Sequence, residues 1–282
     1  MSIDVANIAK LSDGGSSEPQ IQGRLDVCRK WGIPEGSKVL EIGCGQGDCT
    51  LVIAYVVGDQ GHVTAIDPAP LDYGAPMTLG EAQDRLKQCH IGDRITFHQS
   101  NLEAFLASSA SESLYDYAVF AHSIWYLPSA GVLQEMLAAL QGRTKHLLIA
   151  EYSLNIRGDM AALPHMLAAI SQAEFNSRDD ALDRNDNIQT IMSPQTITQL
   201  ASQTGWTLQN EEIVDSPEKK EDGKWEVSRV LSKAYRARSG SSGDAARQAF
   251  ANDLIFAVEE SMRALEPSQV PRTLPTWIGS WV

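Results

Sequence analysis

The sequence of 282 residues has no excess of basic residues. Lys and Arg total 23 against 36 Asp and Glu, which gives a formal net charge of −13. Tight nucleic-acid binding draws on many Lys and Arg contacts to backbone phosphates, and anionic membrane surfaces attract basic segments. The charge balance therefore argues against nucleic acid and membrane surfaces as partners.

Cysteine is scarce, and the spacing of the cysteines does not predict a metal site. Cys28, Cys44, Cys49 and Cys89 form no C-x-x-C pair, and no His cluster supplies zinc-like spacing, so no metal is expected. The N-terminus lacks the apolar core of a secretory signal. No stretch reaches the roughly 18 consecutive apolar residues of a transmembrane helix. These absences predict a cytoplasmic protein with reduced thiols.

What the sequence does contain is typical of a globular enzyme. It is 43% hydrophobic and 21% charged, close to the averages for globular domains. Residues 1–19 are polar and rich in Ser and Gly, which predicts a loose N-terminal arm. The length allows one large domain or two small ones, and no internal repeat divides it.

Short apolar strands alternate with helical patterns over more than 110 residues. Strands are expected at 38–43, 62–67, 95–100, 117–122 and 146–152. Helices are expected at 20–31, 49–57, 76–90, 102–108 and 130–140. Strict alternation of this kind implies βαβ units and a parallel sheet covered on both faces.

The pattern changes after Glu151. Residues 160–175 look helical, 178–186 form an acidic connection, and Ser193-Pro194 starts another helix that ends at Gly205. Residues 206–215 and 225–235 are strand-like and are expected to close the sheet as a late hairpin.

The remaining segment is predicted to be mostly helical. The stretch SGSSG at 239–243 is typical of a flexible joint. Phe250, Leu254, Val258 and Met262 recur every four residues, which indicates an amphipathic helix. The aromatic tail with Trp277 and Trp281 has two open interpretations: it caps a pocket, or it packs against the N-terminal arm.

The most informative segment is VLEIGCGQGDCT at 39–50, where the first strand ends in three spaced glycines. Glycine allows positive φ angles and close approach of a ligand to the backbone, and open α/β sheets bind ligands at this end of their strands. The last glycine of a dinucleotide G-x-G-x-x-G motif falls on Asp48, whose charge opposes a pyrophosphate. The loop therefore favours a ligand without phosphates and argues against NAD.

The pattern E-x-G-x-G-x-G resembles motif I of the class I S-adenosylmethionine-dependent methyltransferases of small-molecule type. The resemblance extends to Asp67, to Ser100-Asn101-Leu102 and to DYAVFAHSIWYL at 116–127. It covers 37–155 well, and 193–235 by the order of elements only. It implies a Rossmann-like α/β fold: a mainly parallel seven-stranded sheet with helices on both faces, a helical lid insert and a C-terminal helical extension.

The resemblance also implies a domain plan. A single methyltransferase domain would span 1–282 and would have five parts in chain order. They are an N-terminal arm and helix (1–36), a cofactor-binding core (37–155), a lid insert (156–192), sheet completion (193–236) and a C-terminal extension (237–282).

The implied cofactor is S-adenosyl-L-methionine, with S-adenosyl-L-homocysteine as product. Glu41 would face the methionine amino group, Asp67 the ribose hydroxyls and Asn101 the adenine amino group, although Asn101 also suits a helix N-cap. The full implied cofactor set is Glu41, Gly43, Cys44, Gly45, Gly47, Asp67, Pro68, Ser100, Asn101, Leu102, Ala121 and His122.

The prediction of a site for the methyl acceptor depends on AHSIWYLP at 121–128, which the resemblance places beside the transferred methyl group. His122 is the candidate general base, since its unperturbed pKa lies near neutrality; the alternative is a ligand contact. Trp125 and Tyr126 are candidates for lining the acceptor pocket or for the core. His165 and Met166, with Phe175, are candidates for a lid or for ordinary packing.

The function expected from these features is methyl transfer to a small molecule, with specialised metabolism as the candidate setting. The proline pair found after the fourth strand of many nucleic-acid and amide N-methylating relatives is absent, since the segment reads AHSI. Two alternatives stay open: a protein on this fold that does not methylate (a scaffold or a non-redox cyclisation catalyst), and a protein-modifying methyltransferase.

Overall fold

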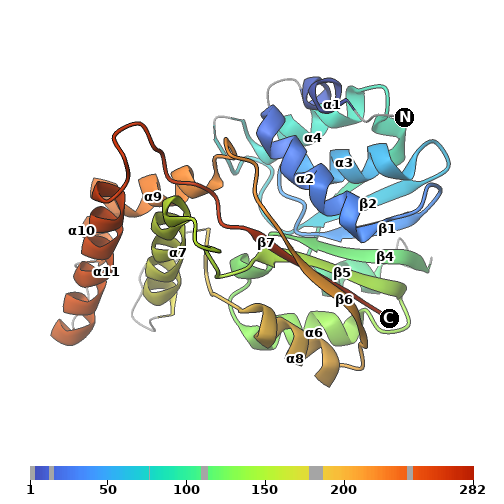
Figure 1. The fold of residues 1–282 in the computed structure, drawn as a ribbon. Coiled ribbons are helices and arrows are strands. Elements are labelled where there is room, and N and C mark those ends of the chain that lie inside the picture. The colour runs from blue at the N-terminus through green and yellow to red at the C-terminus, as the bar shows by residue number, and fades with distance from the viewer. Residues whose placement is uncertain (1–3, 13–15, 76, 109–113, 178–186, 240–243) are drawn as a thin grey trace.

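The sheet is the frame of the molecule in the computed structural model, which describes residues 4–12, 16–75, 77–108, 114–177, 187–239 and 244–282. Within that part of the chain, seven strands form one sheet in the order β3-β2-β1-β4-β5-β7-β6 (Figure 1). Their bounds are Lys38–Ile42 (β1), His62–Asp67 (β2), Ile95–Gln99 (β3), Tyr115–Ala121 (β4), Thr144–Tyr152 (β5), Leu208–Val214 (β6) and Thr276–Trp281 (β7).

Strands β1 to β5 pair in parallel, and β7 runs antiparallel to both β5 and β6. The carboxyl ends of the five parallel strands therefore meet at one edge of the sheet. The alternating sequence pattern predicted this arrangement correctly for all five.

The helices cover both faces of the sheet (Figure 1). Their bounds are Val5–Leu11 (α1), Glu18–Trp31 (α2), Asp48–Val57 (α3), Leu79–Gln88 (α4), Leu102–Ala107 (α5), Ala130–Ala139 (α6), Leu163–Asn176 (α7), Pro194–Gln203 (α8), Asp222–Val230 (α9), Lys233–Ser239 (α10) and Ala245–Arg263 (α11). Short 3₁₀ helices span Gly92–Arg94 (η1), Ile124–Tyr126 (η3) and Met160–Ala162 (η4).

Successive side chains of a strand point to opposite faces, and this divides the core in two. Val39 packs in a cluster with residues of α1 to α4, whereas Leu40 and Ile42 pack in a second cluster with residues of α5, α6 and α8. Both faces are thus buried, as a parallel sheet requires.

The prediction of a strand at 225–235 was wrong, because this stretch forms parts of α9 and α10. Val227 and Val230 are buried at a spacing of three, which fits one face of a helix. The late hairpin was therefore also wrong: the partner of β6 is β7, so Trp277 and Trp281 lie in the sheet.

Two further expectations need correction. The N-terminal arm is not wholly loose, since Val5–Leu11 is helical and Ile8 is fully buried. Helix α11 is present, but Phe250 is 54% exposed, and the buried residues of the helix include Ile255 and Val258. The expected connection at 178–186 and residues 240–243 of the expected joint lie outside the described residues.

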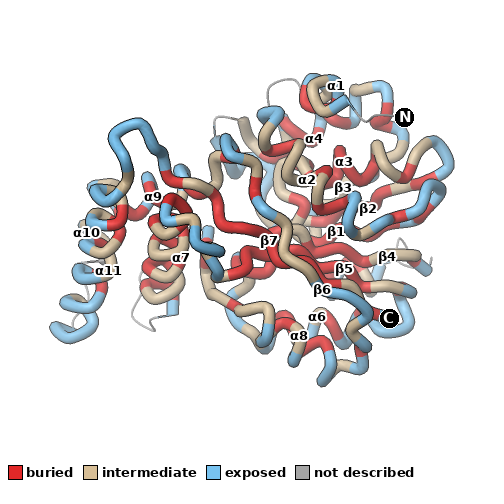
Figure 2. Tube along the Cα trace, viewed as in Figure 1, coloured by how far each residue is buried: buried red, intermediate tan, exposed pale blue. Residues whose placement is uncertain are grey.

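Helices α7, α9, α10 and α11 form a helical extension beside the sheet, and the inner faces of α7 and α11 are buried (Figure 2). Phe175 and Tyr235 pack in its small apolar core. Among the described residues, no helix combines the length and apolarity that a membrane span needs.

Candidate functional site

The glycine loop joins β1 to α3 in a conformation that needs glycine. Gly43, Gly45 and Gly47 have φ angles of 77°, 53° and 92°, in the left-handed region that glycine enters without steric cost. A Cβ atom on Gly45 would meet nothing within 4 Å. The loop therefore presents open backbone at Gly45, where a ligand can approach closely.

Asp67 ends β2 beside this loop. Its Oδ2 atom accepts a hydrogen bond from the Gly45 amide at 2.8 Å, and Oδ1 accepts one from the Ala69 amide at 2.9 Å. Each carboxylate oxygen keeps a further lone pair. Asp67 thus shapes the loop and can still accept hydrogen bonds from a ligand; Pro68, next to it, is exposed.

Glu41 lies in β1 just before the loop and is 1% exposed. The Thr50 hydroxyl donates a hydrogen bond to its Oε2 atom at 2.5 Å. Burial raises the pKa of Glu41 to about 7, against the opposing effects of Thr50 and Arg24. A carboxyl with this pKa exchanges its proton near neutrality. Cys44, in the loop, is buried among apolar side chains, and burial raises the pKa of its thiol.

The segment after β3 lies next to β2, because Asp67 pairs with Gln99. Asn101 caps α5, since its Oδ1 atom accepts a hydrogen bond from the Ala104 amide at 2.8 Å. Leu102 is buried, and the Ser100 hydroxyl donates to the Asn101 carbonyl at 3.0 Å. The structure therefore shows the N-cap role of Asn101, and its role toward adenine stays a prediction.

His122 follows Ala121 at the end of β4 with a positive φ of 56°, which is uncommon for a side chain of this size. Its Nε2 atom is hydrogen-bonded to the Thr276 hydroxyl at 3.3 Å, and its Nδ1 atom lies 3.6 Å from Glu151 Oε1. Burial and the charges of Lys220 and Arg24 hold the pKa of His122 well below 6.5. The imidazole is therefore neutral at pH 7.

Glu151, near the end of β5, holds this region together. It accepts hydrogen bonds from the amides of Ile124, Trp125 and Tyr152 at 3.1, 3.2 and 2.9 Å. Burial raises its pKa to about 7 even with those three donors. Sequence reasoning missed Glu151, although an acid near the end of the apolar strand HLLIAEY was a usable signal.

Tyr152 is the centre of a buried polar cluster. Its ring lies 4.4 Å from the His122 ring and 4.8 Å from the His165 ring, centroid to centroid. Its hydroxyl donates to Asp222 Oδ1 at 2.7 Å, and the Lys220 ammonium lies 5.3 Å above its ring. We call the seven residues Arg24, His122, Glu151, Tyr152, His165, Lys220 and Asp222 the Tyr152 cluster.

Sequence reasoning missed four further members of this cluster. Lys220 and Asp222 lie between 206–215 and 225–235, the two stretches expected to form the late hairpin, and were given no role. Arg24 lies on α2, and nothing in its sequence context distinguished it. Tyr152 was placed in a strand without a role.

The four residues predicted to bind the acceptor differ in how far the structure buries them. His165 is fully buried in the cluster. Trp125 is 2% exposed, lies 5.5 Å from the Tyr152 ring and donates from its indole to the Met192 carbonyl at 3.1 Å, so it is a core residue. Tyr126 is 50% exposed, and Met166 packs partly buried against the main core.

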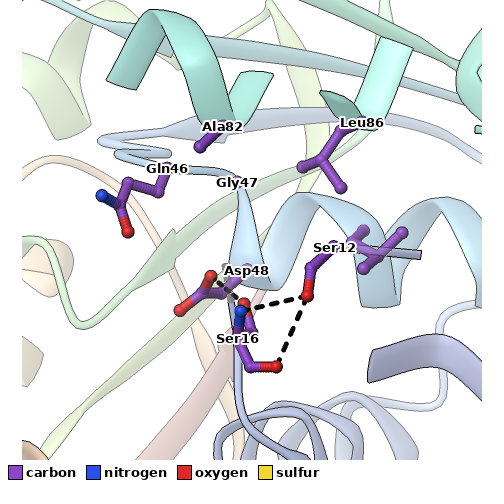
Figure 3. Close-up of a pocket in the computed structure, with 8 residues that line it drawn as sticks. Ser12, Ser16, Gln46, Gly47, Asp48, Ala82 and Leu86 are labelled. Atoms are coloured by element: carbon purple, nitrogen blue, oxygen red, sulfur yellow. Dashed lines mark hydrogen bonds between the residues drawn. The ribbon is translucent and has the colours of Figure 1, made fainter. Parts of the chain in front are cut away.

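A small pocket lies over the start of α3, against the segment that follows α1 (Figure 3). Gln46, Gly47 and Asp48 line it, and the Ser16 hydroxyl donates a hydrogen bond to the Asp48 carboxylate. The pocket has room for about one water molecule. The described residues contain no group of three or more His, Cys, Asp or Glu side chains placed to hold a metal ion.

The edge of the sheet thus carries two chemically different regions. The ends of β1, β2 and β3 offer an open glycine loop with the carboxylate of Asp67. The ends of β4 and β5 carry buried ionisable groups, among them the neutral imidazole of His122 and the carboxyl of Glu151, whose pKa is raised to about 7. The first region suits a ligand with hydroxyl groups, and the second can orient or deprotonate a second molecule.

Comparison with known proteins places these features in a family. The model of a family described as a methyltransferase domain matches residues 33–205. The methyltransferases phomM and phomM' of Diaporthe leptostromiformis are 26% and 25% identical to the chain over 252 residues. These matches cover 68% of this chain, and it spans only 65% of the length of each of these curated relatives.

Two solved structures support the fold. A cyclopropane-fatty-acyl-phospholipid synthase-like protein from Lactobacillus casei is 29% identical, with a TM-score of 0.83, and the match covers 99% of this chain and 100% of that one. The [4+2]-cyclase SpnF is 14% identical with a TM-score of 0.55, covering 95% of this chain and 84% of that one. The second likeness concerns the fold alone.

Proposed function

Because this chain belongs to the methyltransferase-domain family, within the S-adenosylmethionine-dependent class I methyltransferases, we propose that it methylates a small-molecule acceptor. The observation that carries the proposal is the open glycine loop joined to Asp67 by the hydrogen bond from the Gly45 amide at 2.8 Å. We assign the acceptor to the buried polar cluster at the neighbouring strand ends.

The residues present fit the cofactor that the family uses. The open backbone at Gly45 leaves room for close approach, and the carboxylate of Asp67 is a double acceptor that suits a pair of ribose hydroxyls. Glu41, with its pKa raised to about 7, lies beside the loop where the methionine amino group is expected. When bound, S-adenosylmethionine supplies an electrophilic methyl group.

Burial of the acceptor region supports a small molecule rather than a protein or nucleic-acid segment. His122, His165 and Lys220 are 9%, 0% and 4% exposed, so a group that touches them is enclosed by the protein. Such enclosure removes water and holds two reactants in one geometry, which is a large share of what a transferase contributes. The formal net charge of −13 adds to the case against nucleic acid.

We assign two roles for His122 that experiment can separate. As a neutral imidazole, it can accept a proton from a hydroxyl acceptor through its ring nitrogen. With an amine or thiolate acceptor, no base is needed, and His122 orients ligands only. We favour orientation, because the Thr276 hydroxyl already occupies its Nε2 atom and its Nδ1 atom faces the Glu151 carboxyl at 3.6 Å.

The proposal is tested by cofactor binding and then by transfer. S-adenosylhomocysteine should bind in a calorimetric titration and NAD should not, and radiolabelled S-adenosylmethionine should label small molecules from a panel of hydroxyl, amine, thiol and carboxyl acceptors. NAD binding without S-adenosylhomocysteine binding contradicts the cofactor. Cofactor binding with no transfer to any acceptor favours a protein that does not methylate.

A variant at Asp67 tests the observation on which the proposal rests, the contact between Asp67 and the glycine loop. Asp67→Asn keeps an oxygen for the Gly45 amide but loses the charge, so S-adenosylhomocysteine binding should weaken at least ~10-fold, the effect of losing one charged acceptor. The exposed Asp72 provides the matched control, Asp72→Asn, which should bind normally. An unchanged dissociation constant for Asp67→Asn places the ribose elsewhere.

A further inference from the structure

The Tyr152 cluster contains more hydrogen-bond donors than the protein satisfies. In Arg24, the Nε and Nη1 atoms are buried and have no hydrogen-bond partner among the described residues. Arg24 belongs to α2, and its charge interacts with Asp222 and Tyr152 of the cluster as well as with Asp48 at the start of α3. A guanidinium has no acceptor of its own, so these two N–H groups need one from elsewhere.

Lys220 adds a buried ammonium group to the cluster, ion-paired with Asp222 and placed over the Tyr152 ring. Its side chain is 2% exposed, and its Nζ atom lies 3.9 Å from Asp222 Oδ2. That separation is too long for a hydrogen bond. Burial lowers the pKa of Lys220 to about 8, against the attraction of Asp222, so the ammonium form still predominates at pH 7.

His165 is a third donor, approaching from α7. Its Nδ1 atom accepts a hydrogen bond from the Leu274 amide at 3.0 Å, so the neutral ring carries its proton on Nε2. That Nε2 atom is buried without a hydrogen-bond partner in the described part of the chain. Burial lowers the pKa of His165 to about 4, which keeps the ring in this neutral form.

The cluster contains fewer hydrogen-bond acceptor atoms that lack a partner. Asp222 Oδ1 accepts from Tyr152, and Asp222 Oδ2 is its one side-chain oxygen left without a hydrogen bond in the described residues. Both oxygens of Glu151 already accept backbone amides. The unpartnered N–H groups of Arg24 and His165, together with the ammonium of Lys220, therefore call for a ligand rich in acceptors.

From these contacts, we propose that the acceptor molecule carries a carboxylate, which is bound in the Tyr152 cluster by Arg24, Lys220 and His165. This inference rests on the proposed function, because it assigns the ligand of the cluster to the acceptor. A singly charged carboxylate fits better than a phosphate, since Asp222 and Glu151 lie in the same cluster and oppose a second negative charge.

The position of the cluster indicates that the bound carboxylate belongs to the acceptor rather than to the cofactor. Tyr152 ends β5, which lies two strands from β1 and its Glu41, the residue expected to face the methionine group, in the order β1-β4-β5. Neighbouring strands are ~4.8 Å apart, so roughly 10 Å separate these two strands. The cofactor's own methionine carboxylate is the other possible source, and the test below distinguishes the two.

The test compares acids with their primary amides, which match them in shape but lack charge. The probes are benzoate with benzamide, hexanoate with hexanamide, and indole-3-acetate with indole-3-acetamide, titrated calorimetrically into the full chain with saturating S-adenosylhomocysteine. At least one acid should bind ~10-fold or more tightly than its amide, the usual value of a charge-assisted hydrogen bond. Equal affinities, or no binding by any acid, overturn the proposal.

Variants then test which residues cause the preference for the acid over its amide. Lys220→Met removes the ammonium and should abolish the preference for the acid, Lys220→Arg should keep part of it, and the exposed neighbour Lys219→Met should keep all of it. If Lys220→Met does not fold, Arg24→Gln is expected to reduce the preference instead. An undiminished preference in both Lys220→Met and Arg24→Gln overturns the site.

The cofactor is measured separately in the same variants. Lys220→Met should bind S-adenosylhomocysteine as the wild type does. A loss of S-adenosylhomocysteine affinity, with the acid preference retained, assigns the carboxylate to the cofactor and overturns the inference. Failure of the wild type to bind S-adenosylhomocysteine contradicts the proposed function, whereas equal affinity for acid and amide contradicts only the carboxylate site.

Discussion

Single residues near the sheet edge carry protonation states that their burial determines. Glu41 and Glu151 are both 1% exposed, and burial raises the pKa of each to about 7. His122 shows the opposite shift, because burial disfavours the charged form of any group. At pH 7 the imidazole of His122 is therefore neutral, whereas the Glu151 carboxyl that faces it is about half ionised.

The raised pKa of Glu151 predicts a pH-dependent stability. The folded state binds this proton more tightly than the unfolded chain, whose pKa is near 4.5. The stability from this group is present below that pH and is lost as the pH rises to about 7. Relative to Glu151→Gln, which does not titrate, the wild type should lose ~1 kcal/mol per pH unit across this window.

Urea unfolding at several pH values measures the difference. Asp222 does not interfere, since its pKa is held well below its usual range by Lys220 and Arg24, although burial acts in the other direction. A difference between Glu151→Gln and the wild type that stays constant with pH contradicts the assignment.

His122 should remain neutral under conditions that protonate an ordinary histidine. Burial, together with the charges of Lys220 and Arg24, holds its pKa well below 6.5. NMR of ring-labelled histidines should show that the imidazoles of His122 and His165 do not titrate around pH 6.5, and one of these two signals should vanish in His122→Asn. Asparagine tolerates the positive φ at this position. A normal titration midpoint for His122 contradicts the prediction.

At the scale of elements, the turn between β1 and α3 combines two separate demands for glycine. Gly43 needs a positive φ, and a Cβ there would lie 2.5 Å from Ser123 Cβ. Gly45 needs a positive φ, but a Cβ there meets nothing within 4 Å. The two positions therefore separate backbone strain from steric overlap.

Alanine variants at these positions should differ in stability. Gly45→Ala should cost ~1–2 kcal/mol for the left-handed backbone alone. Gly43→Ala should cost a further ~1–3 kcal/mol for the overlap with Ser123. Urea unfolding of both variants provides the measurement, and equal losses contradict the steric argument.

At the scale of the whole molecule, the sheet depends on a strand from the far end of the sequence. β7 lies between β5 and β6 and pairs with both. Trp281 is fully buried, and its ring lies 5.9 Å from that of Trp277. The same segment supplies Thr276 to His122, so the final strand supports both the core and the candidate site.

Loss of one tryptophan from this strand should therefore be severe. Trp281→Ala should destabilise the protein by ~3–5 kcal/mol, as deletion of a large buried side chain does. Val282→Ala, at the next position and 46% exposed, should change the free energy of unfolding by no more than ~0.5 kcal/mol. Thermal or urea unfolding measures both, and a mild loss for Trp281→Ala contradicts the central place of β7.

The sequence by itself determined the parallel sheet, the glycine loop and Asp67. Each of these depends on residues close together in the chain: an apolar run, a glycine spacing, an acid at a strand end. The order of these elements was therefore enough to place Gly43, Gly45 and Asp67 at one edge of the sheet. It also sufficed to favour a ligand without phosphates.

Only the tertiary structure decided what surrounds Tyr152. Arg24, His122, His165 and Lys220 come from four separate parts of the chain, and no local pattern links them. The stretch 225–235 was misassigned because a short apolar run fits a strand or a helix until its burial is known. The partner of β6 was equally beyond reach, since pairing is a contact between distant segments, which local propensity does not encode.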